Sequence, residues 1–372
     1  MKFKVPVNEP CFFGNEKKYL IKCIKDGFIS SSGQFVTKFE KKFAKRLKRK
    51  FAISVSNGTA ALQLAFEALN IKKKEEVILP SFTIISCILP IIRCGAIPVL
   101  VDSDPITWNM DVKKIEDKIT SRTRAIIAPH IYGLPIDMNP LLKIAKKYRL
   151  KVIEDSAEAL GLKYKNKECG SFGDVSTFSF YANKHITTGE GGMIVTNDKN
   201  IFERCKSLRN ICFNEKRRFV HYELGWNYRF TNFQAAVGLA QLEKLNRFII
   251  KKREIGKIYN KELSTIEKFY TPSDEQNYAK NIYWVYGLVL KRNSNIKLST
   301  FMKKLKKEGV ETRNFFWPLH QQPILKKLGF FKKTKLPVAE YLSRNGLYLP
   351  TGLSLTLSQQ KFVINKIKKI MN

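Results

Sequence analysis

The sequence has no uninterrupted apolar run of about 18 residues, the length that a membrane-spanning helix needs. Its start, MKFKVPVNEP, also lacks the apolar stretch of roughly 7–15 residues found in a secretion signal. We therefore expect a cytoplasmic protein with no membrane partner.

Metal-binding and disulfide patterns are also missing. The chain has seven cysteines and four histidines, and no two cysteines form a Cys-x-x-Cys pair. An odd cysteine count in a chain of 372 residues disfavours a disulfide scaffold. The histidines show no zinc-ligand spacing with the cysteines, so we expect no metal site.

Acidic residues are scarce: 32 stand against 67 basic ones, a formal net charge of +35. Such a charge raises the possibility of nucleic-acid binding. The lysines, however, are spread along helix-like segments, and no helix-turn-helix or aromatic-interleaved basic motif is present. We expect no nucleic-acid partner, although a positive field would help to capture a nucleotide diphosphate.

The first two-thirds of the chain alternates short apolar runs with helical patterns. This alternation predicts an α/β fold with a mostly parallel sheet covered by helices. Expected strands are 51–55, 77–79, 99–102, 124–129, 151–154, 175–180 and 192–196, with helices at 60–69 and 139–147.

A long helix is predicted over 233–257, and it could link to a second domain. The remainder combines an apolar run at 283–290 with amphipathic basic helices at 298–308 and 359–370, which indicates a smaller α+β domain. We predict a large domain over 1–245 and a small C-terminal domain over 246–372.

Three motifs carry candidate chemistry, and each follows a predicted strand. Ser56–Ala61 (SNGTAA) opens a helix, where free backbone amides could bind a phosphate. Taken alone, such a pattern is more often only a helix cap and turn. Asp155 could pair with a protonated pyridine nitrogen, or it could simply cap a helix. Lys184 stands in a glycine-rich, aromatic context where low exposure would free its amine as a nucleophile.

Four segments together resemble the DegT/DnrJ/StrS family of sugar aminotransferases: SNGTAALQLAFEAL, EDSAEALG, GSFGDVSTFSFYANKHITTGEGGMIVTND and GWNYRFTNFQAAVGLAQLE. The resemblance runs from about Pro10 to the C-terminal helix and is strongest to the members that aminate a sugar at C-4. It implies the aspartate-aminotransferase fold, pyridoxal 5′-phosphate as cofactor, and a homodimer whose subunits share active sites.

The resemblance also implies roles for single residues. Lys184 would hold the cofactor as a Schiff base and act as the catalytic residue, and Asp155 would face the pyridinium nitrogen. The cofactor phosphate would be held by the backbone amides of Thr59 and Ala60, the Ser179 hydroxyl and, from the partner subunit, Asn227. Glu158 would lie near the cofactor ring, where many relatives carry Gln or His.

One position departs from the family pattern. Many relatives have an aromatic residue where this chain has Ile84, and that residue stacks on the cofactor ring; Phe82 could compensate, or the stack could be absent. The segment ETRNFFWPLH (311–320) resembles the substrate-recognition segment, which makes Arg313 and His320 candidates for substrate binding. The cluster of aromatic residues at 283–286 is expected in the small-domain core.

The resemblance implies transfer of an amino group from L-glutamate to C-4′ of a nucleotide-linked 4-keto-6-deoxy sugar. A GDP-linked substrate giving the perosamine sugar nucleotide is favoured. A UDP- or dTDP-linked 4-keto-6-deoxyglucose giving viosamine is the alternative. Dehydratases in the same family replace the Schiff-base lysine with histidine, whereas here the lysine is present and His185 follows it.

Overall fold

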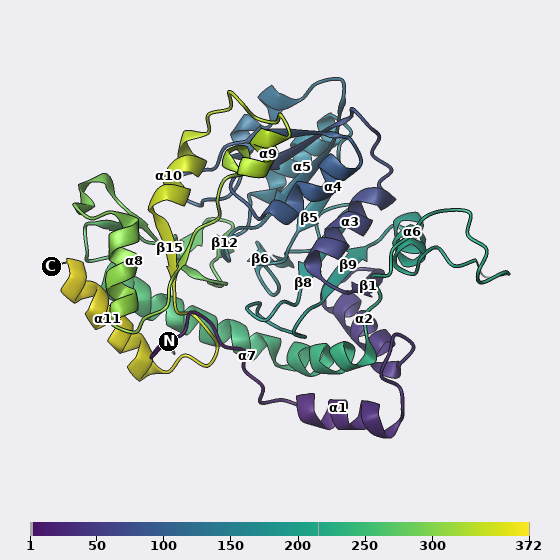
Figure 1. Ribbon diagram of the computed structural model, residues 1–372, viewed down its shortest axis with the longest axis horizontal. Helices are drawn as coiled ribbons and strands as arrows, with labels where there is room; N and C mark the ends of the chain where they lie inside the picture. The colour runs from purple at the N-terminus through teal and green to yellow at the C-terminus, as the bar shows by residue number, and fades with distance from the viewer. Residues whose placement is uncertain (1–2, 215, 372) are drawn as a thin grey trace.

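The computed structural model describes residues 3–214 and 216–371. Its centre is a seven-stranded sheet in the order β1-β9-β8-β5-β4-β2-β3 (Figure 1). Only β9 runs against its neighbours; the other six strands are parallel to one another. The strands span β1 Phe51–Val55, β2 Glu76–Pro80, β3 Ile97–Val101, β4 Thr123–Pro129, β5 Lys151–Asp155, β8 Val175–Ser179 and β9 Gly192–Thr196.

Helices cover both faces of this sheet, as short buried strands in a parallel sheet require. One face packs against α2, α5 and the first half of α7, and the other packs against α3, α4 and α6. The helices span α1 Glu16–Lys25, α2 Gln34–Arg46, α3 Gly58–Ala68, α4 Leu89–Arg93, α5 Met138–Lys147, α6 Lys199–Arg209 and α7 Asn232–Leu263.

A second, antiparallel sheet in the order β10-β13-β15-β14 forms the core of the C-terminal part. Helices α8 and α11 pack on it together with the last turns of α7. The elements are β10 Phe269–Tyr270, β13 Tyr286–Leu290, β14 Arg313–Asn314, β15 Gly346–Leu349, α8 Leu298–Lys307, α9 Pro323–Lys327, α10 Pro337–Asn345 and α11 Leu357–Met371.

Short elements complete the fold. Two hairpins pair β6 (Lys163–Tyr164) with β7 (Lys167–Glu168) and β11 (Glu275–Gln276) with β12 (Ala279–Lys280). Single 3-10 turns are η1 Ile85–Cys87, η2 Val112–Lys114, η3 Glu116–Lys118, η4 Arg292–Ser294 and η5 Leu319–Gln321.

The long helix α7 runs under both parts of the molecule (Figure 1). Its buried side chains belong to the large-sheet core as far as Ile249 and to the small-sheet core from Ile255 onward. Val5, near the N-terminus, also packs in the small-sheet core. The predicted domain boundary at 245/246 therefore stays a prediction. Along the same unbroken helix, the buried side chains change from one core to the other between Ile249 and Ile255.

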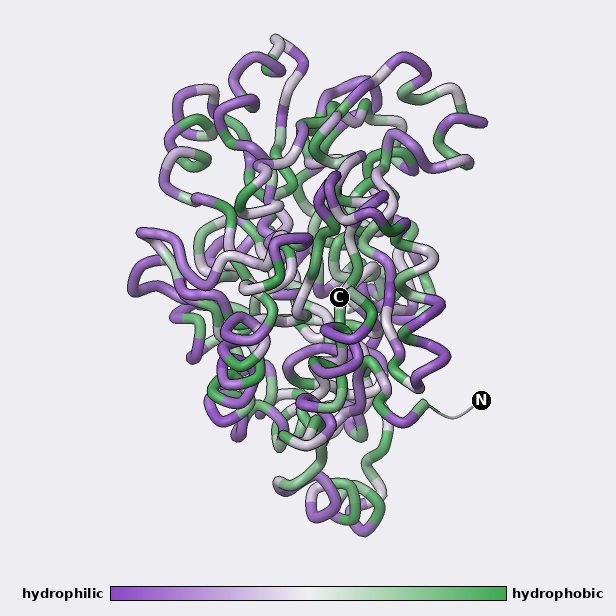
Figure 2. The backbone as a smooth tube through the Cα atoms, turned by 90° about the vertical axis from the view of Figure 1, so that its left-hand side faces the viewer, coloured by the Kyte–Doolittle hydropathy of each residue, from purple (hydrophilic) through white to green (hydrophobic). Residues whose placement is uncertain are grey.

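The sequence predictions for the sheet and for α3, α5, α7, α8 and α11 are confirmed to within a few residues at each end, except at the C-terminal end of α7. No bounds were predicted for helices α1, α2, α4, α6, α9 and α10. The tube coloured by hydropathy places hydrophilic residues along the outer turns (Figure 2). Across residues 3–214 and 216–371, no helix is both long enough and apolar enough to cross a membrane.

Candidate active site

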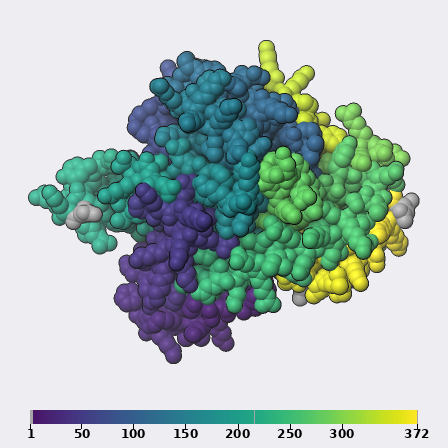
Figure 3. Space-filling model, turned by 180° about the vertical axis from the view of Figure 1, so that it is seen from behind, coloured from purple at the N-terminus to yellow at the C-terminus, as the bar shows by residue number. Residues whose placement is uncertain are grey.

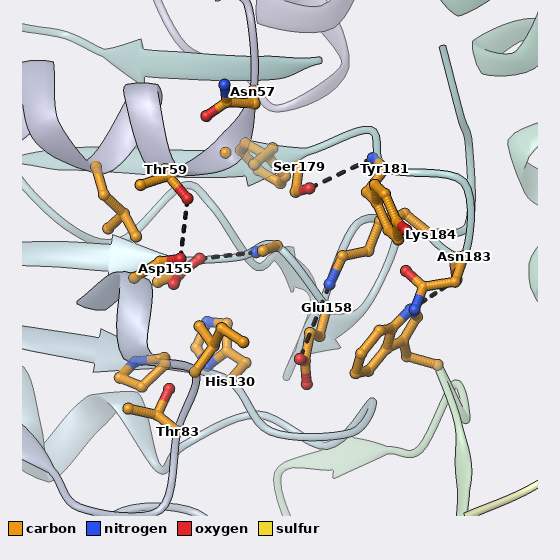
Figure 4. Close-up of a pocket in the computed structure, with 18 of the residues that line it drawn as sticks. Asn57, Thr59, Thr83, His130, Asp155, Glu158, Ser179, Tyr181, Asn183 and Lys184 are labelled. Carbon is orange, nitrogen blue, oxygen red and sulfur yellow. Dashed lines mark hydrogen bonds and ion pairs between the residues drawn. The ribbon is translucent and has the colours of Figure 1, made fainter. Parts of the chain in front are cut away.

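A cavity of about 710 Å³ lies where β1, β5 and β8 end. Parallel sheets bind ligands at the carboxyl ends of their strands, so the three motifs predicted from the sequence meet in one place. Figure 4 shows Asn57, Thr59 and Ser179 at one end of the cavity, with Lys184 and Glu158 at the other. The structure therefore brings together residues that lie more than a hundred positions apart in the chain.

The helix α3 starts at Gly58, directly beside Ser179 at the end of β8. A side chain at position 58 would place its Cβ only 2.8 Å from the Ser179 Cβ, so this close approach requires glycine. The first-turn amides of α3 have no carbonyl in a preceding turn to bond, and they carry the positive end of the helix dipole. This end of the cavity is suited to an anion such as a phosphate.

The Ala60 amide has a partner in the structure: it donates to the Asn57 Oδ1 atom at 2.8 Å, which caps the helix. A phosphate at the predicted position would have to replace that bond. The Thr59 hydroxyl lies 2.9 Å from the Ser86 hydroxyl and lines the cavity with Ser179. Thr59 and Ser179 thus line this end of the cavity, and their contacts with a phosphate stay predictions. The Ala60 amide could bind a phosphate only after its bond to Asn57 is displaced.

Asp155, the last residue of β5, is buried in the cavity wall. Its Oδ1 accepts the Ala157 amide at 3.0 Å, and its Oδ2 accepts only the weak Cys87 thiol donor, with a sulfur–oxygen distance of 3.3 Å. Burial raises the pKa of Asp155, although these donors and Lys184 oppose the increase. A buried carboxylate with so few donors is stabilised by a cation placed against it.

Lys184 follows β8 and reaches into the cavity. Its Nζ lies 3.8 Å from the Glu158 Oε1 atom and 3.8 Å from the ring centroid of Trp284. Burial lowers the pKa of Lys184, while Glu158 and Asp155 act against that decrease. Because a lower pKa leaves more of the amine unprotonated, the environment favours its use as a nucleophile.

Glu158 is the third ionisable group of the cavity. Its Oε2 accepts the Tyr132 amide at 2.8 Å. Burial raises the pKa of Glu158 to about 7, although Lys184 and the Tyr132 amide oppose the increase. The carboxyl group is therefore poised to gain or lose a proton near neutral pH.

The face of the cavity near position 84 lacks the aromatic residue that many relatives carry. Ile84 itself lines the cavity with a partly exposed side chain. Phe82 is fully buried and packs against Tyr132 and Phe315, so it cannot compensate. The suggestion that Phe82 replaces the missing ring is therefore wrong.

Two predicted substrate-binding residues lie outside the cavity. The structure corrects the prediction for His320: it is buried, its Nδ1 lies 2.7 Å from the Ser81 hydroxyl, and its Nε2 lies 3.1 Å from Glu340, so neither nitrogen is free for a sugar. Arg313 is exposed and paired with Glu311 at 3.2 Å. Its strand partner is Tyr348, which lines the cavity, so Arg313 lies close to the rim.

Asn227 does not line the cavity of its own chain. It is exposed in the segment that follows α6, between Trp226 and Tyr228, whose rings stack 5.2 Å apart. Tyr228 lines the cavity, and its carbonyl accepts the Ser56 amide at 3.0 Å. The role of Asn227 in a partner's site stays a prediction.

Sequence reasoning missed Trp284 as a cavity residue. The prediction that residues 283–286 belong to the small-domain core holds for Tyr283 and Tyr286. Trp284 instead lines the cavity and packs, together with Val285, in a different cluster that includes Tyr132. No sequence pattern indicates that Trp284 contacts Lys184.

Among the described residues, one group of three has the spacing of metal ligands: His130, Glu154 and Cys169. The Glu154 carboxylate, however, already accepts His130 Nε2 at 3.0 Å and several backbone amides, including that of Gly170. The Ile136 amide donates to His130 Nδ1 at 3.2 Å. His130 and Glu154 therefore bond to each other and to nearby backbone amides, and these bonds link β4, β5 and the loop around Gly170.

Comparison with known proteins identifies the family. Residues 10–368 match the DegT/DnrJ/EryC1/StrS aminotransferase family. The chain belongs to this family. It is 42% identical to a GDP-perosamine synthase of Escherichia coli O157:H7 over 98% of both chains, and 39% identical to a GDP-perosamine synthase of Vibrio cholerae over 99% of both.

Solved structures agree with the sequence comparison. The Helicobacter pylori aminotransferase PseC, of pseudoaminic acid biosynthesis, superposes with a TM-score of 0.94 at 25% identity, covering 100% of this chain and 99% of its own. The expected aspartate-aminotransferase fold is therefore confirmed. The chain is an aminotransferase that depends on pyridoxal phosphate.

The cavity of this aminotransferase fits that cofactor. The end beside Gly58, Thr59 and Ser179 is suited to the phosphate, and the under-bonded Asp155 carboxylate is suited to the ring nitrogen. The Lys184 amine, with its depressed pKa, is suited to the aldehyde.

Proposed function

We propose that this aminotransferase transfers an amino group from L-glutamate to C-4′ of GDP-4-keto-6-deoxy-D-mannose and so produces the GDP-perosamine sugar nucleotide. The observation that carries the proposal is the 39–42% identity to three GDP-perosamine synthases, each aligned over at least 98% of both chains. The lysine at position 184, within the cavity, supports amination rather than dehydration.

When bound, pyridoxal phosphate supplies an electron sink for the carbanion that forms as the amino donor loses its α-proton. Asp155 would stabilise a positive charge on the ring nitrogen, because its buried carboxylate has only one strong donor of its own. Thr59 and Ser179 would orient the phosphate against the start of α3.

Lys184 would carry the proton. Its Nζ is the amine in the cavity with a depressed pKa, and an amine that titrates nearer neutral pH both accepts and releases a proton efficiently. Glu158, 3.8 Å away, would tune that amine through its own charge. Because the same site handles glutamate and then the sugar, we expect ping-pong kinetics.

Arg313 is the proposed contact for the nucleotide diphosphate. Its guanidinium is exposed near the rim, beside Tyr348 of the cavity wall. A planar guanidinium matches phosphate geometry, and the net charge of +35 would draw a dianionic substrate toward it.

We propose a homodimer in which Asn227 reaches the cofactor phosphate of the partner subunit. The segment after α6 projects from the body of the chain (Figure 3, left edge). It exposes Phe219 to 81% and Leu224 to 94%. Large exposed apolar side chains mark interaction surfaces, and a second copy would bury them.

The test is a substrate panel with purified enzyme and L-glutamate. GDP-, UDP- and dTDP-linked 4-keto-6-deoxy sugars are compared by kcat/KM, with 2-oxoglutarate release as the readout. We expect the GDP-linked sugar to give the highest kcat/KM. A higher value for a UDP- or dTDP-linked sugar would favour the viosamine-type reaction, and no 2-oxoglutarate with any sugar would reject the proposal.

A further inference from the structure

Lys252 is a fully buried lysine on α7, with 1% of its surface exposed. Its Nζ donates to two backbone carbonyls, Trp284 O at 2.9 Å and Thr351 O at 2.6 Å. Among the described residues it forms no ion pair with a carboxylate. Burying an amine costs free energy unless hydrogen bonds offset it, so these two carbonyls are the contacts that hold Lys252 in place.

The two carbonyls come from segments next to the two central strands of the small sheet. Trp284 precedes β13, and Thr351 follows β15. About two turns further along α7, the Tyr259 hydroxyl donates to Pro350 O at 2.9 Å. Positions 252 and 259 lie seven residues apart and share a helix face, so α7 presents a row of donors to these segments.

The side chain of Trp284 connects the Lys252 contact to the active-site lysine. Its indole Nε1 donates to the Asn183 carbonyl at 2.9 Å, next to Lys184 in the chain. Its ring centroid lies 3.8 Å from Lys184 Nζ. The backbone of Gly133 also approaches Trp284 so closely that a Cβ at position 133 would lie 2.6 Å from the Trp284 backbone nitrogen.

We propose that Lys252 is a positioning residue: by holding the Trp284 carbonyl, it fixes the indole that orients the Lys184 amine for cofactor attachment. The inference rests on the proposed role of Lys184. Lys252 lies on α7 and touches neither the cavity nor the reacting atoms. It acts through one backbone carbonyl and one indole ring.

Hydrogen bonding, rather than charge, carries this effect. The groups that influence the charge of Lys184 are Glu158, Asp155 and Cys87, whereas the charge of Lys252 acts on His185. Burial lowers the pKa of Lys252 to about 7. Even a neutral amine keeps two N–H groups, enough for both carbonyls, so the contact persists on either side of that pKa.

The test follows cofactor attachment in the apoenzyme, with no substrate present. Wild type, Lys252→Met, Lys252→Gln and Lys251→Met are mixed with pyridoxal phosphate. Borohydride reduction at timed intervals traps the adduct, and peptide mass spectrometry measures how much is on Lys184. Methionine removes both donors at similar length, glutamine restores two N–H donors without charge, and Lys251→Met is the matched control on the same helix.

We expect Lys252→Met to attach the cofactor at least about tenfold more slowly, because displacing a reacting group by about 1 Å can cost up to a hundredfold. Lys252→Gln should recover part of the rate, and Lys251→Met should match wild type. Acetylation of the exposed Lys280 in the same samples should be unchanged, which separates a local effect from loosening of the whole fold.

A wild-type rate for Lys252→Met would overturn the inference, and so would a glutamine variant with no recovery, since that result would assign the effect to charge. If Lys252→Met does not fold, Trp284→Phe decides: it keeps the ring but loses the bond to Asn183, and unchanged attachment would overturn the inference. Failure of wild type to attach the cofactor at Lys184 would instead reject the proposed function.

Discussion

The substitution Glu158→Gln tests the electrostatics of the active-site lysine. Glu158 Oε1 lies 3.8 Å from Lys184 Nζ, and both groups are shielded from water. At about 4 Å and an effective dielectric constant of ~20, opposite unit charges attract by ~4 kcal/mol. Glutamine removes that attraction but keeps an oxygen for the Tyr132 amide, so the geometry should survive.

The sign follows from the charged form of each partner. An ionised Glu158 stabilises the ammonium of Lys184 and raises its pKa; removing the charge should lower the pKa of Lys184 further below its usual value. The effect should be largest above pH 7, because the pKa of Glu158 is about 7 and its carboxyl group is ionised there. More of the amine is then neutral and reactive.

The assay is trace acetylation of the apoenzyme, with the label on Lys184 measured by peptide mass spectrometry at several pH values. We expect at least about a tenfold faster reaction at pH 8, which corresponds to ~1.4 kcal/mol, a third of the full attraction. Glu116→Gln, which alters a distant surface carboxylate, is the control and should have no effect. An unchanged or slower reaction in Glu158→Gln would refute the reasoning.

Three further predictions concern the cavity and its support. Gly58→Ala should weaken pyridoxal phosphate binding by about tenfold or more in a fluorescence titration, because the alanine Cβ would lie 2.8 Å from the Ser179 Cβ. Unchanged affinity would show that the start of α3 can move without loss of phosphate binding. Asp155→Asn should lower turnover by at least about a hundredfold while cofactor still attaches to Lys184, because an amide cannot offset a pyridinium charge; near-normal turnover would contradict its role. Glu154→Gln should cost about 3 kcal/mol of unfolding free energy at neutral pH: burial raises the pKa of Glu154, but His130 and backbone amides outweigh it and hold the pKa at about 2. Its folded pKa lies below its ordinary value of 4.5, so this stabilisation is present above pH 4.5 and is lost as pH falls toward 2; urea melts of wild type should show that loss, and the variant should not.

The sequence predicted the strands of the large sheet well, and the motifs that it singled out line one cavity, for a physical reason. Short apolar runs located β1, β5 and β8. Parallel strands present their carboxyl ends at one edge of the sheet, so the motifs that follow these strands were expected to lie close together. The amphipathic basic helix α8 followed from its spacing of apolar residues.

Contacts that depend on tertiary packing could not be predicted in this way. His320 was a candidate for substrate binding, but folding pairs it with Ser81 and Glu340. Trp284 was predicted in the core with its neighbours, and only the folded structure shows its ring beside Lys184. Lys252 looked like one more solvated lysine of a basic helix, yet it is buried.

The most direct test of the account is to locate the cofactor chemically. Wild-type enzyme saturated with pyridoxal phosphate is reduced with borohydride and digested, and the peptides are mapped by mass spectrometry. We predict a single phosphopyridoxyl group on Lys184, and its loss together with turnover in Lys184→Ala. A phosphopyridoxyl group on another lysine, or full turnover in Lys184→Ala, would contradict the account.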